Sequence, residues 1–278
     1  MLKYIVLITK KQPGILNELE KQCTNQGVSF FYVLPEFETK IRETLYITDD
    51  HEIFQGLWEE GASVLVWLHE ENKGENFTKA EYLFENIEEI DFIYLERSYR
   101  RLRKIPWIIK ETKRCIIREM TEEDLEQLYE IYRGKSITQY IEGLYEEKEE
   151  EREFITSYIE SAYKFYGYGT WVIEDKLTKK LIGRVGFNLR EGYEEPELGF
   201  VIAEQYQRQG YAYECCSAVI ENSREEFGFE MIQALVKEGN YNSARLCLKL
   251  GFKETEPVFW EEEKYLRYIK FLGVRQPK

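Results

Sequence analysis

The sequence predicts an α/β protein made of two domains, with a boundary near residue 110. Over residues 1–110, short apolar runs alternate with helical patterns, which is typical of a small, parallel, Rossmann-like sheet. Over residues 111–278 a different order appears, with three consecutive strand candidates between helical segments. The 278 residues suffice for two domains of ordinary size, and 43% of them are hydrophobic, so a sizeable core can be buried.

The elements of the first domain follow from runs of apolar residues and from capping residues. Strands are expected at residues 4–9, 28–34, 43–50 and 62–68. Helices are expected at residues 14–27, 51–61 and 91–104. Gly27 is a C-cap candidate for the first helix, and Asp49 or Asp50 can cap the second. Residues 108–115 are interpreted as the linker between the domains.

The elements of the second domain begin with a strand at residues 115–120 and a helix at 121–133, which Thr121 and Asp124 can cap. A long acidic helix at 147–166 precedes the strand candidates at 169–175, 181–190 and 196–202. Helices at 210–228 and 240–252 flank a strand at 229–236, and closing strands are expected at 257–272. The two domains differ in pattern, and no internal repeat is apparent.

The charge of the chain limits its partners. The net charge of −14 repels phosphate backbones, so nucleic acid is a poor candidate partner, whereas a cationic ligand such as an amine is attracted. Solvated helix faces are the alternative explanation for the glutamate runs. No apolar run approaches the ~20 residues that a membrane span needs. The N-terminus is interpreted as a first strand, not as a signal peptide.

Cysteine and histidine usage limits the chemistry. Five cysteines without a CxxC pair predict reduced thiols in the cytoplasm, not disulfides or a zinc site. The two histidines, His51 and His69, have no ligand cluster near them in the sequence, so neither a metal site nor a histidine triad is expected.

The segment "QYQRQGYAYECC", residues 205–216, places a basic and glycine-containing turn between a strand and a helix. Such a turn can hold a pyrophosphate, because its N–H groups and the helix dipole favour an anion there. Gly210 lets the backbone approach closely, and Arg208 can add a charge. Many turns of this kind bind nothing, so an ordinary turn remains the alternative. Cys215 and Cys216 have the spacing of a buried helix face.

Three segments together resemble the GNAT superfamily of acyl-CoA N-acyltransferases. Gln207-x-x-Gly210-x-Ala212 resembles its Q/R-x-x-G-x-G/A signature, and "ELGFVIAEQY" before it resembles the fourth strand of the family. Downstream, the Asn240–Ser243–Cys247–Gly251–Phe252 spacing resembles a family helix. The resemblance covers about residues 115–272 and is strongest to ribosomal-protein N-terminal acetyltransferases. It implies a mixed, mostly antiparallel sheet with flanking helices.

The resemblance also implies site residues. Acetyl-CoA is the expected co-substrate, without a metal, and its pantetheine arm would pair with the strand main chain. The implied cofactor-binding residues are Phe200, Val201, Ile202, Gln207, Arg208, Gln209, Gly210, Tyr211, Ala212, Asn240 and Ser243.

Three residues are candidates for the proton transfers. Glu197 is the candidate base, through water, with a salt bridge or a substrate-positioning role as the alternative. Many family members have a tyrosine, which protonates the leaving thiolate, where this chain has Cys247. The Cys247 thiol, the neighbouring Tyr241 hydroxyl or no enzyme acid at all could serve, and Cys247 is otherwise a small buried residue.

The first domain loosely resembles the haloacid-dehalogenase Rossmann-type module. A working phosphatase of that kind needs an Asp-x-Asp pair after its first strand, and this chain has lysines there. We therefore interpret the domain as an accessory for packing, substrate gating or formation of a homodimer.

The sequence thus predicts an N-acetyltransferase that moves acetyl from acetyl-CoA to a primary amine, on a small molecule or a protein N-terminus. One alternative is a non-catalytic acyl-CoA sensor, which the absence of the tyrosine at 247 favours. Another is a hydrolase centred on Asp49 and Asp50.

Overall fold

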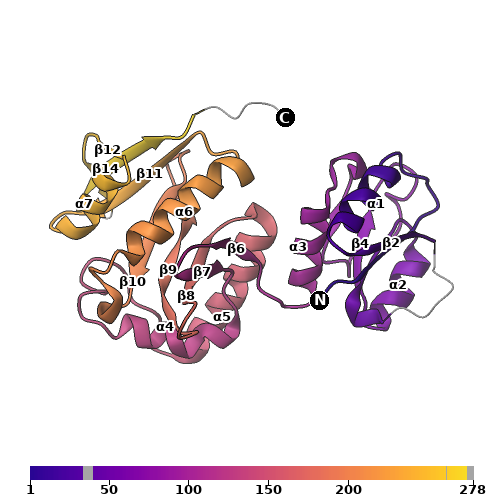
Figure 1. Ribbon diagram of the computed structural model, residues 1–278, viewed down its shortest axis with the longest axis horizontal. Coiled ribbons are helices and arrows are strands. Elements are labelled where there is room, and N and C mark those ends of the chain that lie inside the picture. The colour runs from indigo at the N-terminus through magenta and orange to yellow at the C-terminus, as the bar shows by residue number, and fades with distance from the viewer. Residues whose placement is uncertain (34–39, 261, 274–278) are drawn as a thin grey trace. The chain divides into compact units, whose positions relative to one another are not determined.

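The computed structural model describes residues 1–33, 40–260 and 262–273. Contacts group the chain into two compact units, Met1–Trp107 and Ile108–Lys278 (Figure 1). Leu34 and Glu261, which belong to predicted strands, and residues 274–278 lie outside the described residues.

The first unit contains a five-stranded sheet in which every pairing is parallel, as the sequence predicts. Its strands lie in the order β2-β1-β3-β4-β5. They are β1 (Tyr4–Ile8), β2 (Ser29–Tyr32), β3 (Thr44–Thr48), β4 (Ser63–Trp67) and β5 (Leu83–Phe84), and the sequence analysis missed the last, two-residue strand. The helices are α1 (Leu16–Asn25), α2 (His51–Glu59) and α3 (Phe92–Leu102), with short 3₁₀ turns η1 (Ile41–Glu43) and η2 (Ile87–Glu89).

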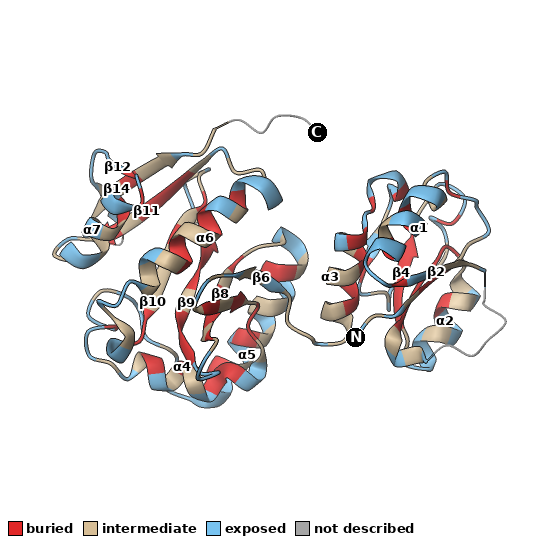
Figure 2. Cartoon of the chain, in the orientation of Figure 1, coloured by how far each residue is buried: buried red, intermediate tan, exposed pale blue. Residues whose placement is uncertain are grey.

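Both faces of this sheet are buried, which explains its nearly continuous apolar strands. Ile5 and Leu7 of β1 pack into one cluster with residues of α1 and α3. Val6, between them, packs into a second cluster with Phe54 of α2. Figure 2 shows the inner strand β4 as buried, the edge strand β2 as mostly intermediate, and the outward sides of the helices as exposed.

Two carboxylates at the carboxyl end of β3 stabilise this unit. Asp49 is buried and accepts hydrogen bonds from the main-chain amides of Lys10 (2.8 Å) and Lys11 (3.0 Å). His69 Nε2 lies 3.1 Å from the same carboxylate. Asp50 caps α2 and forms an ion pair with Lys10 at 2.8 Å. Since these contacts join β1, β3 and β4, both side chains have a structural role that requires no hydrolase chemistry.

The second unit contains a nine-stranded sheet that is mostly antiparallel. Its strand order is β12-β14-β11-β10-β9-β8-β7-β6, with β13 on β14. The strands are β6 (Ile108–Glu111), β7 (Cys115–Arg118), β8 (Thr170–Asp175), β9 (Leu181–Asn188), β10 (Glu197–Ile202), β11 (Met231–Lys237), β12 (Lys253–Glu254), β13 (Val258–Trp260) and β14 (Glu263–Phe271). This mixed sheet is the one expected for the second domain.

The segment expected to be a linker begins with a strand. Residues 108–111 form β6, which pairs with β7 across a short turn where Thr112 N donates to Cys115 O at 2.9 Å. The strand pairing draws residues 108–110 into the second unit, so the structural division falls slightly before the boundary expected near residue 110. Adjacent β-branched residues, Ile108 and Ile109, suit a strand better than a solvated linker.

Helices cover the two faces of the second sheet. They are α4 (Leu125–Tyr132), α5 (Lys148–Tyr158), α6 (Tyr211–Glu226) and α7 (Tyr241–Lys249), with 3₁₀ turns η3 (Glu122–Asp124) and η5 (Glu204–Tyr206). Side chains of α6 and α7 share one core cluster with the sheet, and those of α4 and α5 share another (Figure 1). The predicted long helix continues after α5 as a π-helical segment, η4 (Ile159–Tyr166), which ends at the left-handed Gly167.

Candidate active site

The strands β10 and β11 are parallel neighbours that pair only at Glu197 and Gln233. There, Gln233 N donates to Pro196 O at 3.0 Å. Successive residues of a strand direct their main-chain N–H and C=O groups to opposite edges of that strand. The main-chain groups of Phe200 and Ile202 therefore face β11, as the carbonyl of Pro196 does. The strands have separated at that point, so this edge of β10 borders an opening in the sheet.

A pocket of about 520 Å³ lies beside this opening. Its wall contains every cofactor-binding residue expected from the sequence except Gln209, namely Phe200, Val201, Ile202, Gln207, Arg208, Gly210, Tyr211, Ala212, Asn240 and Ser243. Gln209 is turned away from the pocket. Its side-chain amide donates to Gln205 O at 2.7 Å, and its main-chain carbonyl accepts from Arg114 Nη1 at 3.1 Å. The structure therefore brings residues of β10, the following turn and α7 to one cavity.

The turn before α6 is built to present main-chain amides. Gly210 has a φ of 84°, in the left-handed region, and stands immediately before the first residue of α6. The first N–H groups of a helix have no partner within it, so they point towards the turn and favour an anion. Gly210 is required because other residues pay a steric penalty at this φ.

An ion pair between Arg114 and Glu214 stabilises the turn. The guanidinium of Arg114 lies 3.8 Å above the ring of Tyr211 and donates to Glu214 Oε2 at 2.7 Å. Burial alone would raise the pKa of Glu214, but hydrogen bonds from Thr112 and Arg114 outweigh it and hold that pKa below its usual range. Glu214 is therefore ionised at neutral pH and keeps Arg114 against the turn.

Two basic residues that the sequence analysis missed, Arg245 and Lys249, also line the pocket. They stand four residues apart in α7, a spacing that places both on one helix face and could have indicated them. Arg208 adds a third cation and donates to Asn242 Oδ1 at 3.2 Å. In a chain of net charge −14, three cations around one cavity make its charge locally positive, which favours an anion.

The loop after α4 forms another wall that no sequence motif indicated. Ser136 N donates to Glu204 Oε1 at 2.8 Å, next to the turn before α6. Tyr140 Oη donates to Gly239 O at 3.1 Å, next to the start of α7. Ser136 and Tyr140 both line the pocket, so this loop connects the segment after β10 with the segment after β11, on the two sides of the opening.

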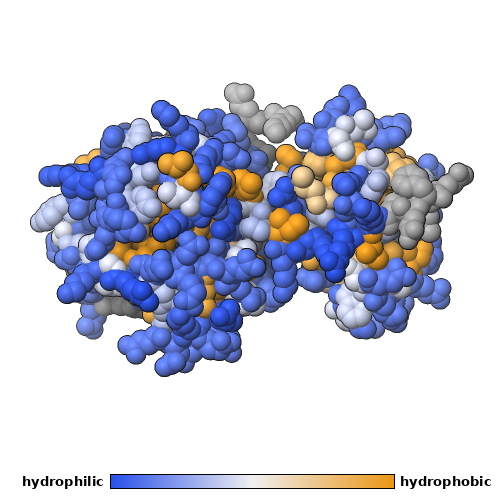
Figure 3. Space-filling model, turned by 60° about the horizontal axis from the view of Figure 1, so that its bottom comes forward, coloured by the Kyte–Doolittle hydropathy of each residue, from blue (hydrophilic) through white to orange (hydrophobic). Residues whose placement is uncertain are grey.

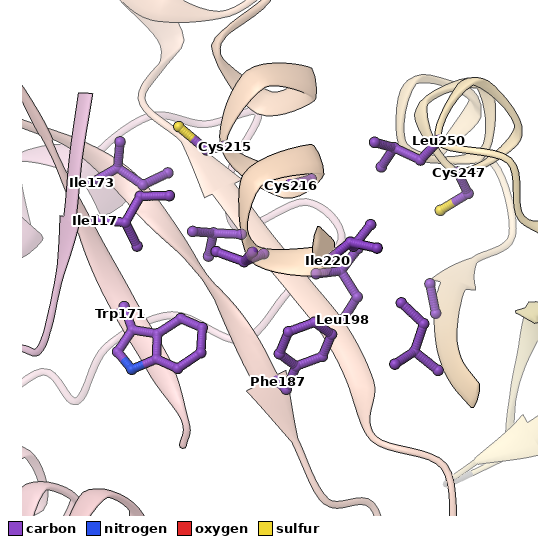
Figure 4. Packing of buried hydrophobic residues seen from close by; sticks show 14 of the residues in the cluster. Ile117, Trp171, Ile173, Phe187, Leu198, Cys215, Cys216, Ile220, Cys247 and Leu250 are labelled. Carbon is purple, nitrogen blue, oxygen red and sulfur yellow. The ribbon is translucent and has the colours of Figure 1, made fainter. Parts of the chain in front are cut away.

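Two of the expected proton donors lie away from the pocket. Cys247 is 0% exposed, and its burial raises the pKa of the thiol to about 12. Figure 4 shows its sulfur on the side of α7 that faces Ile220 and Leu198. Tyr241 is 73% exposed and is not part of the pocket wall. Neither side chain is therefore placed to protonate a leaving group bound in this cavity, and the placement of Cys247 fits the packing alternative.

The candidate base, Glu197, is held by an ion pair. Its carboxylate binds the guanidinium of Arg190 through both oxygens, with Arg190 Nη2 3.3 Å from Oε1. Arg190 also lies 5.0 Å from the ring centre of Trp260. Glu197 stands where β10 and β11 begin to separate, which places its side chain at the closed end of the opening.

Comparison with known proteins identifies the family. A family model described as the acetyltransferase (GNAT) domain matches residues 114–253. The chain is 34% identical over 150 residues to the protein named uncharacterized N-acetyltransferase YoaA of Bacillus subtilis, a match that covers 52% of this chain and 83% of that protein. The chain belongs to the GNAT acetyltransferase family. The resemblance of its sequence motifs is thereby confirmed, and the chain is an acyl-CoA-dependent acetyltransferase.

Other GNAT proteins match over a similar part of the chain. The uncharacterized N-acetyltransferase YnaD of Bacillus subtilis is 29% identical over 164 residues, covering 55% of this chain and 93% of that protein. The ribosomal-protein-S5-alanine acetyltransferase of Vibrio fischeri has a TM-score of 0.51 at 16% identity, over 58% of this chain and 95% of that one. RimL, a ribosomal alpha-N-protein acetyltransferase solved with coenzyme A, has a TM-score of 0.50 at 15% identity, over 59% and 98%. At these identities the two structures show a shared fold.

The GNAT match begins at residue 114, so the first unit lies outside it.

Figure 3 shows mostly hydrophilic side chains on the visible face of the molecule, with apolar residues in scattered patches. In the described part of the chain, no helix combines the length and the apolar character needed to cross a membrane. Among the same residues, no group of three or more His, Cys, Asp and Glu side chains could hold a metal ion.

Proposed function

We propose that this chain transfers an acetyl group from acetyl-CoA to a primary amine, which attacks the thioester directly while both substrates are bound. The observation that carries this proposal is the opened edge of β10 beside a pocket with three cations. An extended chain with amide groups can pair with such an edge, and its phosphates can bind at the basic end. Coenzyme A combines both features.

In the proposed binding mode, each group of pocket residues binds a different part of coenzyme A. The main chain of Phe200 and Ile202 pairs with the pantetheine amides. The amides of residues 207–212 hold the pyrophosphate at the start of α6, where the helix dipole and the turn favour negative charge. Arg245 and Lys249 bind further phosphate charge from α7. Asn240, whose Oδ1 accepts from Ser243 N at 3.2 Å, keeps its amide nitrogen for the cofactor.

The chemistry requires mainly position. A neutral amine attacks the thioester carbonyl without a covalent enzyme intermediate, so holding both reactants together supplies most of the acceleration. A main-chain N–H of β10 at the opening can stabilise the negative charge that develops on the carbonyl oxygen. Since Cys247 and Tyr241 lie away from the pocket, we assign no enzyme acid, and the CoA thiolate leaves unassisted.

Glu197 is proposed to position the acceptor. The role of catalytic base is weakened by Arg190, because both carboxylate oxygens of Glu197 already bind its guanidinium. A carboxylate has more lone pairs than Arg190 uses, so it can still accept a hydrogen bond from an ammonium group. The amine would therefore be drawn to Glu197 and lose its proton to water.

The charge of the chain and the names of its relatives support the proposed acceptor class. A net charge of −14 attracts cations, and amines are cationic at neutral pH. Two of the structural neighbours are named as ribosomal-protein acetyltransferases, which supports a protein N-terminus as one acceptor class beside small amines.

The compartment and the first unit are further parts of the proposal. All five cysteines are buried free thiols, which fits the reducing cytoplasm. The first unit is proposed to be an accessory that gates substrate or forms a homodimer. Deletion of residues 1–107 should leave CoA binding intact and change acceptor KM or the mass seen by light scattering.

The test of the proposed function is acetyl-CoA-dependent thiol release with a panel of amines. The panel contains amino-acid amides, short peptides and polyamines, and release is followed with a thiol reagent in the absence and presence of each amine. We expect release that requires an amine, together with CoA binding by calorimetry. CoA binding without turnover on any amine would instead indicate a sensor, and absence of CoA binding would overturn the assignment of the pocket.

A further inference from the structure

The side chain of Asn188 lies at the point where the sheet opens. Asn188, the last residue of β9, is paired in register with Glu197 of β10. Gly199 lies two residues further along β10. If Gly199 carried a side-chain carbon, Asn188 Nδ2 would lie 3.6 Å from it. Among the described residues other than the chain neighbours of Gly199, no other atom would lie within 4 Å of that carbon. The space above Gly199 is therefore open, and the amide nitrogen of Asn188 borders it.

This open space lies next along β10 to residues of the proposed cofactor pocket. Gly199 directly precedes Phe200, the first β10 residue of the pocket wall. Val201, like Gly199 and Glu197, directs its side chain to the face of the sheet covered by α4 and α5, since it packs into their cluster. A molecule above Gly199 would thus reach the closed end of the opening from the side opposite α6.

The orientation of the Asn188 amide is set by hydrogen bonds to its oxygen. Asn188 Oδ1 accepts from Tyr158 Oη and from Thr170 Oγ1, both at 3.2 Å. The Tyr158 hydroxyl itself accepts from Thr170 N at 2.6 Å, so its own proton is directed to Asn188. With the oxygen engaged, the amide nitrogen and its two N–H donors are directed to the space above Gly199.

The π-helical segment places the residue that orients Asn188. Tyr158 and Tyr163 are five residues apart, a spacing that brings side chains to one face in a π-helix but not in an α-helix. Tyr163 is fixed by hydrogen bonds with Met120 N at 3.2 Å and Thr170 O at 2.5 Å. A side-chain carbon at Gly169 would lie 2.7 Å from the Tyr158 hydroxyl, so a larger residue there would force Tyr158 to move.

From these contacts we infer that Asn188 binds the acceptor. It selects amines in which the carbon that bears the amino group also bears a carbonyl group. This inference rests on the proposed function and names the acceptor class of the same site. An N–H donor pair needs an acceptor atom, which an α-amino amide or a peptide N-terminus supplies and a simple alkyl amine lacks. Glu197, the cross-strand partner of Asn188, takes the ammonium of the same molecule.

The test compares two amines of similar shape, alaninamide and 2-aminobutane, in the wild-type protein and in Asn188→Asp. The substitution keeps the size of the side chain and the acceptor for Tyr158, removes the N–H donors, and adds a negative charge that acts on both ammonium groups alike. We therefore expect kcat/KM for alaninamide to fall by about 10-fold or more relative to kcat/KM for 2-aminobutane. Comparing each amine with itself across the variants cancels the different basicities of the two amines.

The controls separate binding from folding. Leu189→Ala changes an exposed neighbour on the same strand end and should alter neither value. Tyr158→Phe keeps the ring but removes one of the two hydrogen bonds to Asn188 Oδ1, and should raise KM for alaninamide while KM for acetyl-CoA stays unchanged. The acetyl-CoA KM and the melting temperature are measured for every variant.

Each outcome bears on the inference. A selective loss with alaninamide supports it. An equal loss with both amines, or no loss with either, would overturn it while leaving the proposed function intact. Failure of the wild-type protein to acetylate any amine, despite CoA binding, would overturn the inference and the proposed function together.

Discussion

Arg190 binds both carboxylate oxygens of Glu197 at the point where β10 and β11 separate. The guanidinium also lies 5.0 Å from the centre of the Trp260 ring. Glu197, which the sequence left open as a catalytic base or as a member of a salt bridge, is thus one half of an ion pair, and its role depends on the partner that the fold supplies.

Replacement of Glu197 by glutamine should weaken acceptor binding. We expect KM for the amine to rise about 10-fold, the effect of losing one charge-assisted hydrogen bond, with little change in kcat. The shape of the kcat pH profile should be the same as in the wild-type protein. Glu195→Gln, which changes the nearby carboxylate paired with Arg267 at 3.0 Å, is the matched control. A fall in kcat of about 100-fold with loss of the acidic limb would instead identify Glu197 as the base.

Replacement of Gly210 by glutamate should abolish CoA binding. The substitution strains a backbone with a φ of 84° and puts a negative charge where the phosphates are proposed to bind. Calorimetry with CoA measures the effect. Gly27→Glu has a similar φ of 72° and the same change of charge in the first unit, so it should keep CoA affinity. Retention of micromolar affinity in Gly210→Glu would show that the turn does not hold the phosphates.

Replacement of Cys247 by alanine should cost stability without affecting catalysis. The thiol is 0% exposed in the core between α7 and the sheet, so its removal leaves a small cavity worth about 1 kcal/mol. We expect kcat within about 2-fold of the wild-type value, since the residue does not line the pocket. A native protein that reacts with iodoacetamide at Cys247, or a variant with a large loss of kcat, would contradict this placement.

The cap of α2 should be sensitive to acid. Burial alone would raise the pKa of Asp50, but hydrogen bonds from Lys10 and from two helix amides outweigh it and keep that pKa below its usual value. The stabilising contribution is therefore present above the unfolded pKa of about 4 and is lost as the pH falls through the lower folded pKa.

Asp50→Ala should accordingly destabilise α2 by about 1 kcal/mol at pH 7, and the difference from the wild-type protein should shrink below about pH 4. Hydrogen exchange of the α2 amides measures this locally. Asp50→Asn retains a capping oxygen and should keep most of the stability while losing the pH dependence. An exchange rate in Asp50→Ala equal to the wild-type rate would show that the cap contributes nothing.

Much of the fold and part of the site follow from local sequence. Apolar runs, capping residues and glycine turns specify the parallel sheet, most helices and the turn at Gly210, because these depend on neighbours within a few residues. The resemblance of the segments around Gln207, Gly210 and Asn240 to GNAT motifs likewise indicated residues that the structure brings to one pocket.

Only the tertiary structure decided which side chains reach the site. It buried Cys247, turned Tyr241 to solvent, paired Arg190 with Glu197 and set Tyr158 against Asn188, which is 30 residues away in sequence. It also drew residues 108–111 into the second sheet and bridged the opening with the loop that carries Tyr140. In these cases the direction of a side chain depends on packing and hydrogen bonds with elements far along the chain. A local pattern of residues does not determine which of those elements come into contact.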